Sequence, residues 1–297
     1  MTPRGSERVI ALATSSNVPE LTDDDRLLVR ALASAGVFAV PAIWDDCREN
    51  WHRYAAVVIR SCWDYHLKHG EFLAWLHRLE TTGVRVLNSP ALVRWNAEKT
   101  YLRELAACGV ASVPTRWVER DELISLDAIL HAREWDRVVV KPAISASAHE
   151  TWRASSASAH AAEPRFRLMV TNGEVLVQPF LDVVQADGEW SHLFYGGVYS
   201  HSVLKRPRSG DFRVQREHGG TSEALVSSRE MIAAARGVLR AAEQGRGASL
   251  YARVDGCVIE REFVLMELEL IEPDLFLRSN DAAPDLLAVA LLDVLQT

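Results

Sequence analysis

The sequence lacks the short motifs that mark several common classes of enzyme. No GxGxxG follows the first apolar segment, which argues against a dinucleotide cofactor, and no GxxxxGK[ST] occurs anywhere, which excludes a P-loop. The sequence also contains no HExxH and no Ser/His/Asp signature. Any catalytic chemistry therefore has to come from other residue patterns.

Cysteines and long apolar runs are also scarce. The four cysteines lie far apart and form no CxxC pair, which predicts reduced thiols in a cytoplasmic protein. No apolar run approaches the length of a membrane span, and the first residues, MTPRGSERVIALATSS, lack a signal-peptide core of adequate length. The net charge of -7 comes from acids and bases mixed along the chain. We therefore expect neither a membrane nor a nucleic acid as a partner.

Strands alternate with helices over the first part of the chain. Strands are expected at residues 9–14, 37–41, 55–59 and 84–87. Helices are expected from the N-cap Thr22 to Gly36 and at 71–82. This alternation predicts a parallel, Rossmann-like sheet.

Strands predominate in the rest of the chain. They are expected at residues 115–118, 137–141, 166–170, 174–178, 190–195, 198–205, 250–258 and 262–271. Helices are expected at 97–107, 229–242 and 284–295, and the Ser/Ala-rich stretch 154–164 is expected to be a loop. With 297 residues, 48% of them hydrophobic, the chain can bury cores in two or three subdomains. The predicted fold class is an α/β lobe followed by an α+β body.

The stretch LMELELIEP, residues 265–273, is an acidic strand. Side chains alternate along a strand, so Glu267 and Glu269 share one face with Leu265 and Ile271. Two neighbouring carboxylates repel each other unless the face is open to water or a cation lies between them. A solvated antiparallel face and a hard metal ion such as Mg²⁺ both explain the pattern.

Lys141 closes an apolar strand in RVVVKPAISASAHET, residues 137–151. A lysine at the end of a buried strand needs an anionic partner. The small-residue loop after it, with Ser145 and Ser147, exposes backbone N–H groups and hydroxyls that suit a phosphate. A lysine that simply faces solvent is the alternative.

Two further segments are compatible with a nucleotide. In LVQPFLDVVQADGEWS, residues 176–191, a strand runs into a proline and leaves backbone groups that a purine edge could use. In LKRPRSGDFRVQREHGG, residues 204–220, five basic residues gather in a globally acidic chain and suit an anion with developing charge. A solvated basic loop is the alternative for the second segment.

Taken together and in this order, these segments resemble the ATP-grasp family over roughly residues 95–280. In its glutathione-synthetase-like branch, a Glu-x-Asn motif is preceded by an aspartate on the neighbouring strand. Glu267, Glu269 and Asp255 match these positions, with Glu269 standing where that branch has asparagine. The resemblance implies that these three acids bind Mg²⁺, with two ions expected, and that ATP is a co-substrate.

The resemblance also implies a division of the chain. Residues 1–95 would form an N-terminal α/β lobe that meets the substrate. Residues 96–180 and 181–297 would form two α+β subdomains that enclose ATP, with the metal site in the second of them.

Residues of the expected central subdomain match ATP-binding positions of the family. Lys99 in NAEKTYL and Lys141 look like the two lysines that reach the phosphates and the adenine side of ATP. Ser145 and Ser147 fall in the loop that covers the phosphates, which is poor in glycine here.

The adenine and ribose positions follow. Gln178, Phe180 and Leu181 match the hinge whose backbone reads adenine, and Glu189 looks like the acid that binds the ribose hydroxyls.

Two cations in the basic segment look catalytic. Lys205 and Arg213 match the residues that hold the transferred phosphoryl group, and His218, Gly219 and Gly220 lie in the neighbouring loop.

The resemblance implies an ADP-forming carboxylate–amine ligase that works through an acyl phosphate. The sequences GDFRVQ and LIEPD also resemble a narrower branch that includes the cyclo-ligase forming D-cycloserine from O-ureido-D-serine. This implies an intramolecular cyclisation. The alternatives are an intermolecular ligase that joins small amino acids or tags a peptide, and a nucleotide-binding regulatory protein without turnover.

The substrate is expected to be a small, amino-acid-like carboxylate that meets the N-terminal lobe. In RSCWDYH, residues 60–66, Arg60 could clamp a carboxylate and Asp64 an ammonium group. An ion pair between Arg60 and Asp64, beside packed Trp63 and Tyr65, is the alternative. A homo-oligomer is compatible with the sequence.

The acid triad also makes a prediction about strand register. A regular two-residue turn at Glu260-Arg261 would pair Asp255 with Met266, on the face opposite Glu267. We therefore expect an odd-numbered loop or a bulge in this hairpin; a three-residue loop would place Asp255 diagonal to Glu267.

Overall fold

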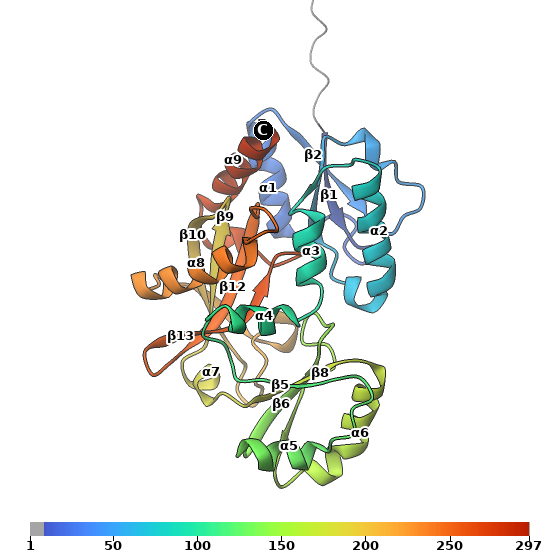
Figure 1. Cartoon of the computed structure of the whole chain (residues 1–297). Coiled ribbons are helices and arrows are strands. Elements are labelled where there is room, and N and C mark those ends of the chain that lie inside the picture. Colours follow the sequence, from blue (N-terminus) through green and yellow to red (C-terminus); the bar gives the residue numbers. More distant parts are fainter. Residues whose placement is uncertain (1–8, 297) are drawn as a thin grey trace, which may run out of the picture.

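The computed structural model describes Val9 to Gln296. Residues 1–8 and Thr297 lie outside the described residues. The start of the segment that was searched for a signal-peptide core lies there too. Three sheets make up the fold, each built from a consecutive part of the chain (Figure 1). We call them the N-terminal, central and C-terminal sheets. Within the described residues, no helix combines the length and apolarity needed to cross a membrane.

The N-terminal sheet is parallel, with strand order β2-β1-β3-β4. Its strands are β1 (Val9–Thr14), β2 (Phe38–Ile43), β3 (Ala56–Ser61) and β4 (Val86–Leu87). Helices α1 (Asp23–Ser34) and α2 (His69–Thr81) connect them. Thr22 caps α1 as predicted, because its hydroxyl accepts a hydrogen bond from the Asp25 N–H at 3.0 Å. The Rossmann-like lobe is confirmed.

The central sheet is antiparallel, with strand order β5-β8-β6-β7. It comprises β5 (Arg116–Val118), β6 (Arg137–Pro142), β7 (Trp152–Ser155) and β8 (Val175–Pro179), with helices α5 (Leu126–Arg133) and α6 (Ala159–Asn172). The predicted loop at 154–164 and strand at 166–170 are wrong. Phe166, Met169 and Val170 recur at helical spacing and pack in the core of this sheet. The short apolar run at 166–170 fits the two-residue period of a strand as well as the period of a helix.

The C-terminal sheet is antiparallel, with strand order β11-β10-β9-β12-β13. Its strands are β9 (Glu189–Tyr195), β10 (Val198–Arg206), β11 (Thr221–Ala224), β12 (Tyr251–Ile259) and β13 (Glu262–Glu269). Helix α7 (Asp182–Ala186) precedes it, and helix α8 (Arg229–Glu243) packs on one face. Four short 3₁₀ helices complete the secondary structure: Trp51–Arg53, Tyr65–Lys68, Arg216–His218 and Leu277–Ser279.

The helix expected at 97–107 begins later, at Tyr101. Helices α3 (Pro90–Asn96) and α4 (Tyr101–Ala107) flank a short break that contains Lys99. Tyr101 and Leu105 of α4 share a core with α8 and β13, so this helix packs against the C-terminal sheet. The subdomain boundaries stay a prediction.

The last helix, α9 (Ala283–Gln296), runs beside α1 (Figure 1). Leu287 and Leu291 of α9 share a core with Leu28 and Leu32 of α1 and with residues of the C-terminal sheet. The N-terminal lobe and the C-terminal sheet are thus joined by one continuous core.

The β12–β13 hairpin closes with a two-residue turn at Glu260-Arg261. Both residues have a positive φ, 50° and 72°, as tight hairpin turns require. The three-residue loop considered for this hairpin is therefore wrong. With regular pairing from this turn, Asp255 would pair with Met266. Its side chain would then point to the other side of the sheet from that of Glu267.

A β-bulge corrects the register. Gly256 pairs with Leu265, whereas Asp255 pairs with Glu267, so Met266 is the extra residue of β13. The prediction of an odd-numbered loop or a bulge is confirmed by the bulge. Directly opposed residues point to the same face, so Asp255 lies beside Glu267 rather than diagonal to it.

We predict that Gly256→Ala destabilises the protein by about 1–3 kcal/mol. A Cβ at this position would lie 2.4 Å from the Val264 carbonyl oxygen and 2.5 Å from the Phe263 ring. The matched control is Gly237→Ala in α8, where a Cβ meets nothing within 4 Å. Alanine is also the better helix former there, by up to about 1 kcal/mol. Equal midpoints of urea denaturation for the two variants would contradict the prediction.

Candidate active site

A cavity of about 790 Å³ receives side chains from all three sheets and their connecting loops. It brings together nearly all of the residues that the sequence singled out. Those lining it are Arg60, Lys99, Lys141, Ser145, Ser147, Gln178, Phe180, Leu181, Glu189, Lys205, Arg213, Gly220, Asp255, Glu267 and Glu269. Asp64, His218 and Gly219 do not line it.

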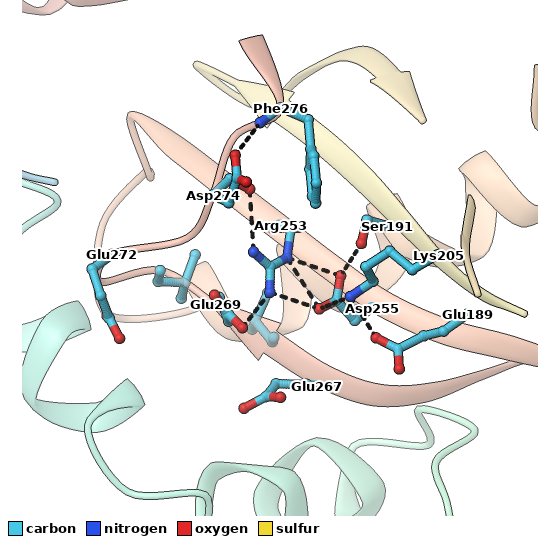
Figure 2. Close-up of polar contacts among 12 residues, drawn as sticks. Glu189, Ser191, Lys205, Arg253, Asp255, Glu267, Glu269, Glu272, Asp274 and Phe276 are labelled. Atoms are coloured by element: carbon cyan, nitrogen blue, oxygen red, sulfur yellow. Dashed lines mark hydrogen bonds and ion pairs between the residues drawn. The ribbon is translucent and has the colours of Figure 1, made fainter. Parts of the chain in front are cut away.

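Arg253 lies at the centre of the acidic strands, and the sequence analysis missed it (Figure 2). Its Nε donates to both carboxylate oxygens of Asp255, at 3.1 and 3.0 Å, and another guanidinium nitrogen bonds Glu269. Arg253 opposes Glu269 across the hairpin, as Asp255 opposes Glu267. The signal was present, because Arg253 precedes Asp255 by two residues and so shares its face.

Lys205 bridges two acids on the other side of Asp255. Its Nζ lies 2.6 Å from Glu189 and 3.0 Å from Asp255, and the Ser191 hydroxyl donates to Asp255 at 2.7 Å. Asp255 is only 1% exposed. Burial alone would raise the pKa of Asp255, but the charges of Arg253 and Lys205 hold it well below its usual range.

Lys99 connects the acidic strand to the loop after β6. Its Nζ donates to Glu267 and, at 3.0 Å, to the Ser145 carbonyl, while its backbone N–H donates to the Ala143 carbonyl at 2.8 Å. Against the effect of burial, Lys99 and Lys141 lower the pKa of Glu267. Burial raises the pKa of Glu269 to about 7 in spite of Arg253.

Lys141 differs from these cations because no acid within residues 9–296 forms an ion pair with it. It is the next-to-last residue of β6 and lines the cavity, where burial lowers its pKa to about 8. The expected anionic partner is thus not supplied by the described part of the chain. A bound anion would supply it.

The predicted adenine hinge is only partly free. The Phe180 N–H donates to the Arg137 carbonyl at 2.8 Å, so it is not available to a ligand. The side-chain amide of Gln178 donates to the Thr115 hydroxyl at 2.8 Å. The Phe180 ring and Leu181 remain as cavity walls.

The loop after β10 carries Arg213 into the cavity wall. Arg213 makes a two-point contact with Asp211, at 3.1 and 2.8 Å. Gly220 also lines the cavity, and a Cβ there would lie 2.0 Å from the Val214 carbonyl oxygen. The structure does not support a binding role for His218 or Gly219, which lie outside the cavity lining.

In the N-terminal lobe, Arg60 lines the cavity but pairs with another acid than Asp64, and its role as a clamp for a substrate carboxylate stays a prediction. Its Nε donates to Asp25 at 2.8 Å, and another guanidinium nitrogen donates to the Pro273 carbonyl at 2.9 Å. Asp64 accepts from the Trp44 indole at 2.9 Å and from Lys68 at 3.0 Å. The Arg60–Asp64 ion pair is therefore wrong, and the structure does not support Asp64 as a substrate ligand.

The three predicted metal ligands share a face but do not form a ready metal site. Among residues 9–296, no group of three or more His, Cys, Asp or Glu side chains is arranged to hold a metal ion. Asp255 and Glu269 are instead bound by Arg253, and Glu267 by Lys99. The donors are still hard oxygens of the kind Mg²⁺ takes when substrate phosphates complete its shell. The site thus fits an ion that arrives with a nucleotide.

Comparison with known proteins identifies the family. Residues 10–88 match the model of the N-terminal domain of D-cycloserine synthetase DcsG. The cycloserine biosynthesis protein DcsG of Streptomyces lavendulae is 34% identical over 205 residues, which are 66% of this chain and 67% of that protein. The chain belongs to the DcsG family of ATP-grasp ligases.

Solved structures agree with this assignment. The crystal structure of D-cycloserine synthetase DcsG is 29% identical and has a TM-score of 0.87, covering 97% of this chain and 99% of that one. A RimK domain ATP-grasp protein from Sphaerobacter thermophilus shares the fold, with a TM-score of 0.67 at 19% identity over 95% and 98% of the two chains. The predicted ATP-grasp fold and the prediction of a ligase are confirmed.

We predict that nucleotide affinity depends on the charge of Lys141. Because its pKa is lowered to about 8, Lys141 is charged at pH 7 and loses its proton as the pH rises above 8. The affinity for a non-hydrolysable ATP analogue should therefore fall between pH 7.5 and 9.5.

Two variants test this assignment. Lys141→Arg should keep its charge and a flat pH profile over that range. Lys141→Ala should bind weakly at every pH. A wild-type profile in Lys141→Ala, measured by equilibrium dialysis, would contradict the prediction.

Proposed function

We propose that this chain cyclises O-ureido-D-serine to D-cycloserine in an ATP-dependent, ADP-forming reaction through an acyl phosphate. The observation that carries the proposal is the similarity to D-cycloserine synthetase DcsG over the whole fold, at a TM-score of 0.87. The charge pattern of the cavity supports the chemistry. A small amino-acid-like carboxylate is the substrate.

The nucleotide end of the site is assigned to the central sheet. Lys141 would meet the phosphates as a half-buried cation that forms no ion pair with the described residues. Ser145 and Ser147 lie in the loop that Lys99 holds through the Ser145 carbonyl, where they would cover the phosphates. Leu181 would border the adenine, and Glu189 would meet the ribose.

Magnesium would be bound together with ATP and would supply positive charge that neutralises the phosphates. Glu267 and Glu269 would hold it, since each has only one carboxylate oxygen bound by a cation of the chain. Asp255 would join them if one of its carboxylate oxygens lost its hydrogen bond to Lys205 or Arg253. The prediction of two ions stays a prediction.

The first chemical step transfers a phosphoryl group. A carboxylate oxygen of the substrate attacks the γ-phosphorus of ATP, the bond to the bridging oxygen breaks, and ADP leaves. Lys205 and Arg213 would neutralise the charge that develops on the transferred group. Arg253 would act beside them, because it lies between Asp255 and Glu269 on the same face.

The second step closes the ring. The ureido nitrogen bonded to oxygen attacks the acyl carbon, and phosphate leaves. Proximity favours this reaction because both groups belong to one molecule. Water then has to remove the carbamoyl group from that nitrogen, as ammonia and carbon dioxide, before the product is D-cycloserine.

An assay with a single substrate tests the proposal. Enzyme, magnesium–ATP and O-ureido-D-serine, with no added amine, should release equal amounts of ADP and phosphate and form D-cycloserine, as measured by mass spectrometry. Phosphate release that requires a second amino acid or a peptide would identify an intermolecular ligase. Nucleotide binding without release on any carboxylate would identify a regulatory protein.

We predict that Glu267→Gln lowers kcat at least about 100-fold and leaves the melting temperature nearly unchanged. The side chain is 28% exposed, and the glutamine amide oxygen can still accept a hydrogen bond from Lys99, so the substitution disturbs little else. Glu262→Gln, an exposed position on the same strand, is the matched control. Wild-type turnover by Glu267→Gln at saturating Mg²⁺ would refute the metal assignment. Asp255→Asn is a poorer test, because Asp255 is 1% exposed and bonded to Lys205, Arg253 and Ser191, so its substitution disturbs stability as well as metal binding.

A further inference from the structure

Glu272 stands out among the acids of the cavity because its carboxylate has no cationic partner. The side chain is 9% exposed and lines the cavity three residues beyond Glu269. No other residue among 9–296 donates a hydrogen bond or forms an ion pair with its carboxylate; only its own backbone N–H approaches it. Figure 2 shows it apart from the paired acids, with no contact to the residues drawn.

The other buried or half-buried carboxylates of the cavity each form an ion pair with a cation of the chain. Arg60 pairs with Asp25, and Arg278 pairs with Asp24 and Asp274. Those of the metal face pair with Lys99, Lys205 or Arg253. Glu272 is therefore the buried acid of this cavity that forms no ion pair within the described residues, although the charge of Lys99 is near enough to act on it.

The backbone around Glu272 is held in place. Its own carbonyl accepts from the Trp63 indole at 3.0 Å, the Pro273 carbonyl accepts from Arg60 at 2.9 Å, and the Asp274 carbonyl accepts from Arg253 at 3.2 Å. Three consecutive carbonyls thus fix this segment between the N-terminal lobe and β12. The Glu272 carboxyl group therefore extends from a fixed backbone and forms no ion pair with a cation of the described residues.

A carboxylate in this position is costly without a counter-charge. Burial, together with the negative charges of Glu269 and Glu267, raises the pKa of Glu272 well above its ordinary value. A cationic ligand group would remove that cost and form a charge-assisted hydrogen bond. Lys141 shows the converse, because no acid among residues 9–296 pairs with it and an anionic ligand is expected beside it.

We propose that Glu272 binds the ammonium group of an amino-acid substrate whose carboxylate is activated beside Arg253 and Glu269. This inference rests on the proposed function for the location of the reacting carboxylate. It names the substrate class as an α-amino acid with a free amino group. It assigns to Glu272 the ammonium-binding role that the sequence analysis gave to Asp64.

Binding without turnover tests this separately from ring closure. The protein is loaded with magnesium and a non-hydrolysable ATP analogue and titrated with O-ureido-D-serine, D-serine and D-alanine. Each is compared with its counterpart lacking the amino group: 3-(ureidooxy)propanoate, 3-hydroxypropanoate and propanoate. At least one amino compound should bind the wild type roughly tenfold to hundredfold more tightly than its counterpart.

The variants locate the preference. Glu272→Gln should bring each pair to similar affinities by weakening the amino compound alone, and Glu272→Asp should retain part of the preference. Glu262→Gln is the matched control and should behave as wild type. Unchanged affinity of Glu272→Gln for the ATP analogue shows that the fold is intact.

Two results would overturn the inference. One is equal affinity of the wild type for every amino compound and its counterpart. The other is a preference that persists in Glu272→Gln. A preference that depends on Glu272 in a protein that forms no D-cycloserine would uphold the inference and refute the cyclisation, so the two failures are distinguishable.

Discussion

The β-bulge at Met266 sets the register of the β12–β13 hairpin and so determines which side chains reach the cavity together. One extra residue puts Asp255 opposite Glu267 and Arg253 opposite Glu269 on a single face. Lys99 then reaches this face from the break before α4, and Lys205 reaches it from β10. Without the bulge, Asp255 and Arg253 would turn to the other face, and the cations would lose the acid between them.

The cavity contains many buried charges, and the chain compensates most of them internally. An isolated buried charge is expensive, whereas a well-paired one is tolerated. The pairs Lys205–Asp255, Lys99–Glu267 and Arg253–Glu269 therefore keep the ligand-free site stable. A ligand that carries charges of both signs would exchange these partners for its own charged groups.

Local patterns predicted the parts of the site that lie on strands. Alternation along the strand placed Glu267 and Glu269 on one face, and the same parity argument required an odd loop or a bulge near Asp255. Lys141 was recognisable as a lysine close to the end of an apolar strand. The Arg60–Asp25 pair was not predictable, because its partners are 35 positions apart in sequence and meet only through the tertiary fold. Helix α6 was missed because five apolar-rich residues fit a strand as well as a helix turn.

The distribution of the cores determines which part of the molecule can move. Helix α9 unites the N-terminal lobe and the C-terminal sheet in one core, whereas the central sheet has a core of its own, built from residues 118–177. Separating the first two would expose apolar surface along α1 and α9, which the hydrophobic effect strongly opposes. Rotation of the central sheet would leave these two cores intact but would disturb the packing of Ala143 and Leu176 against the C-terminal sheet. Ligands would then enter and leave as the central sheet rotates about hinges at its two ends. Lys141 would move with this sheet, whereas the β12–β13 hairpin would stay in place.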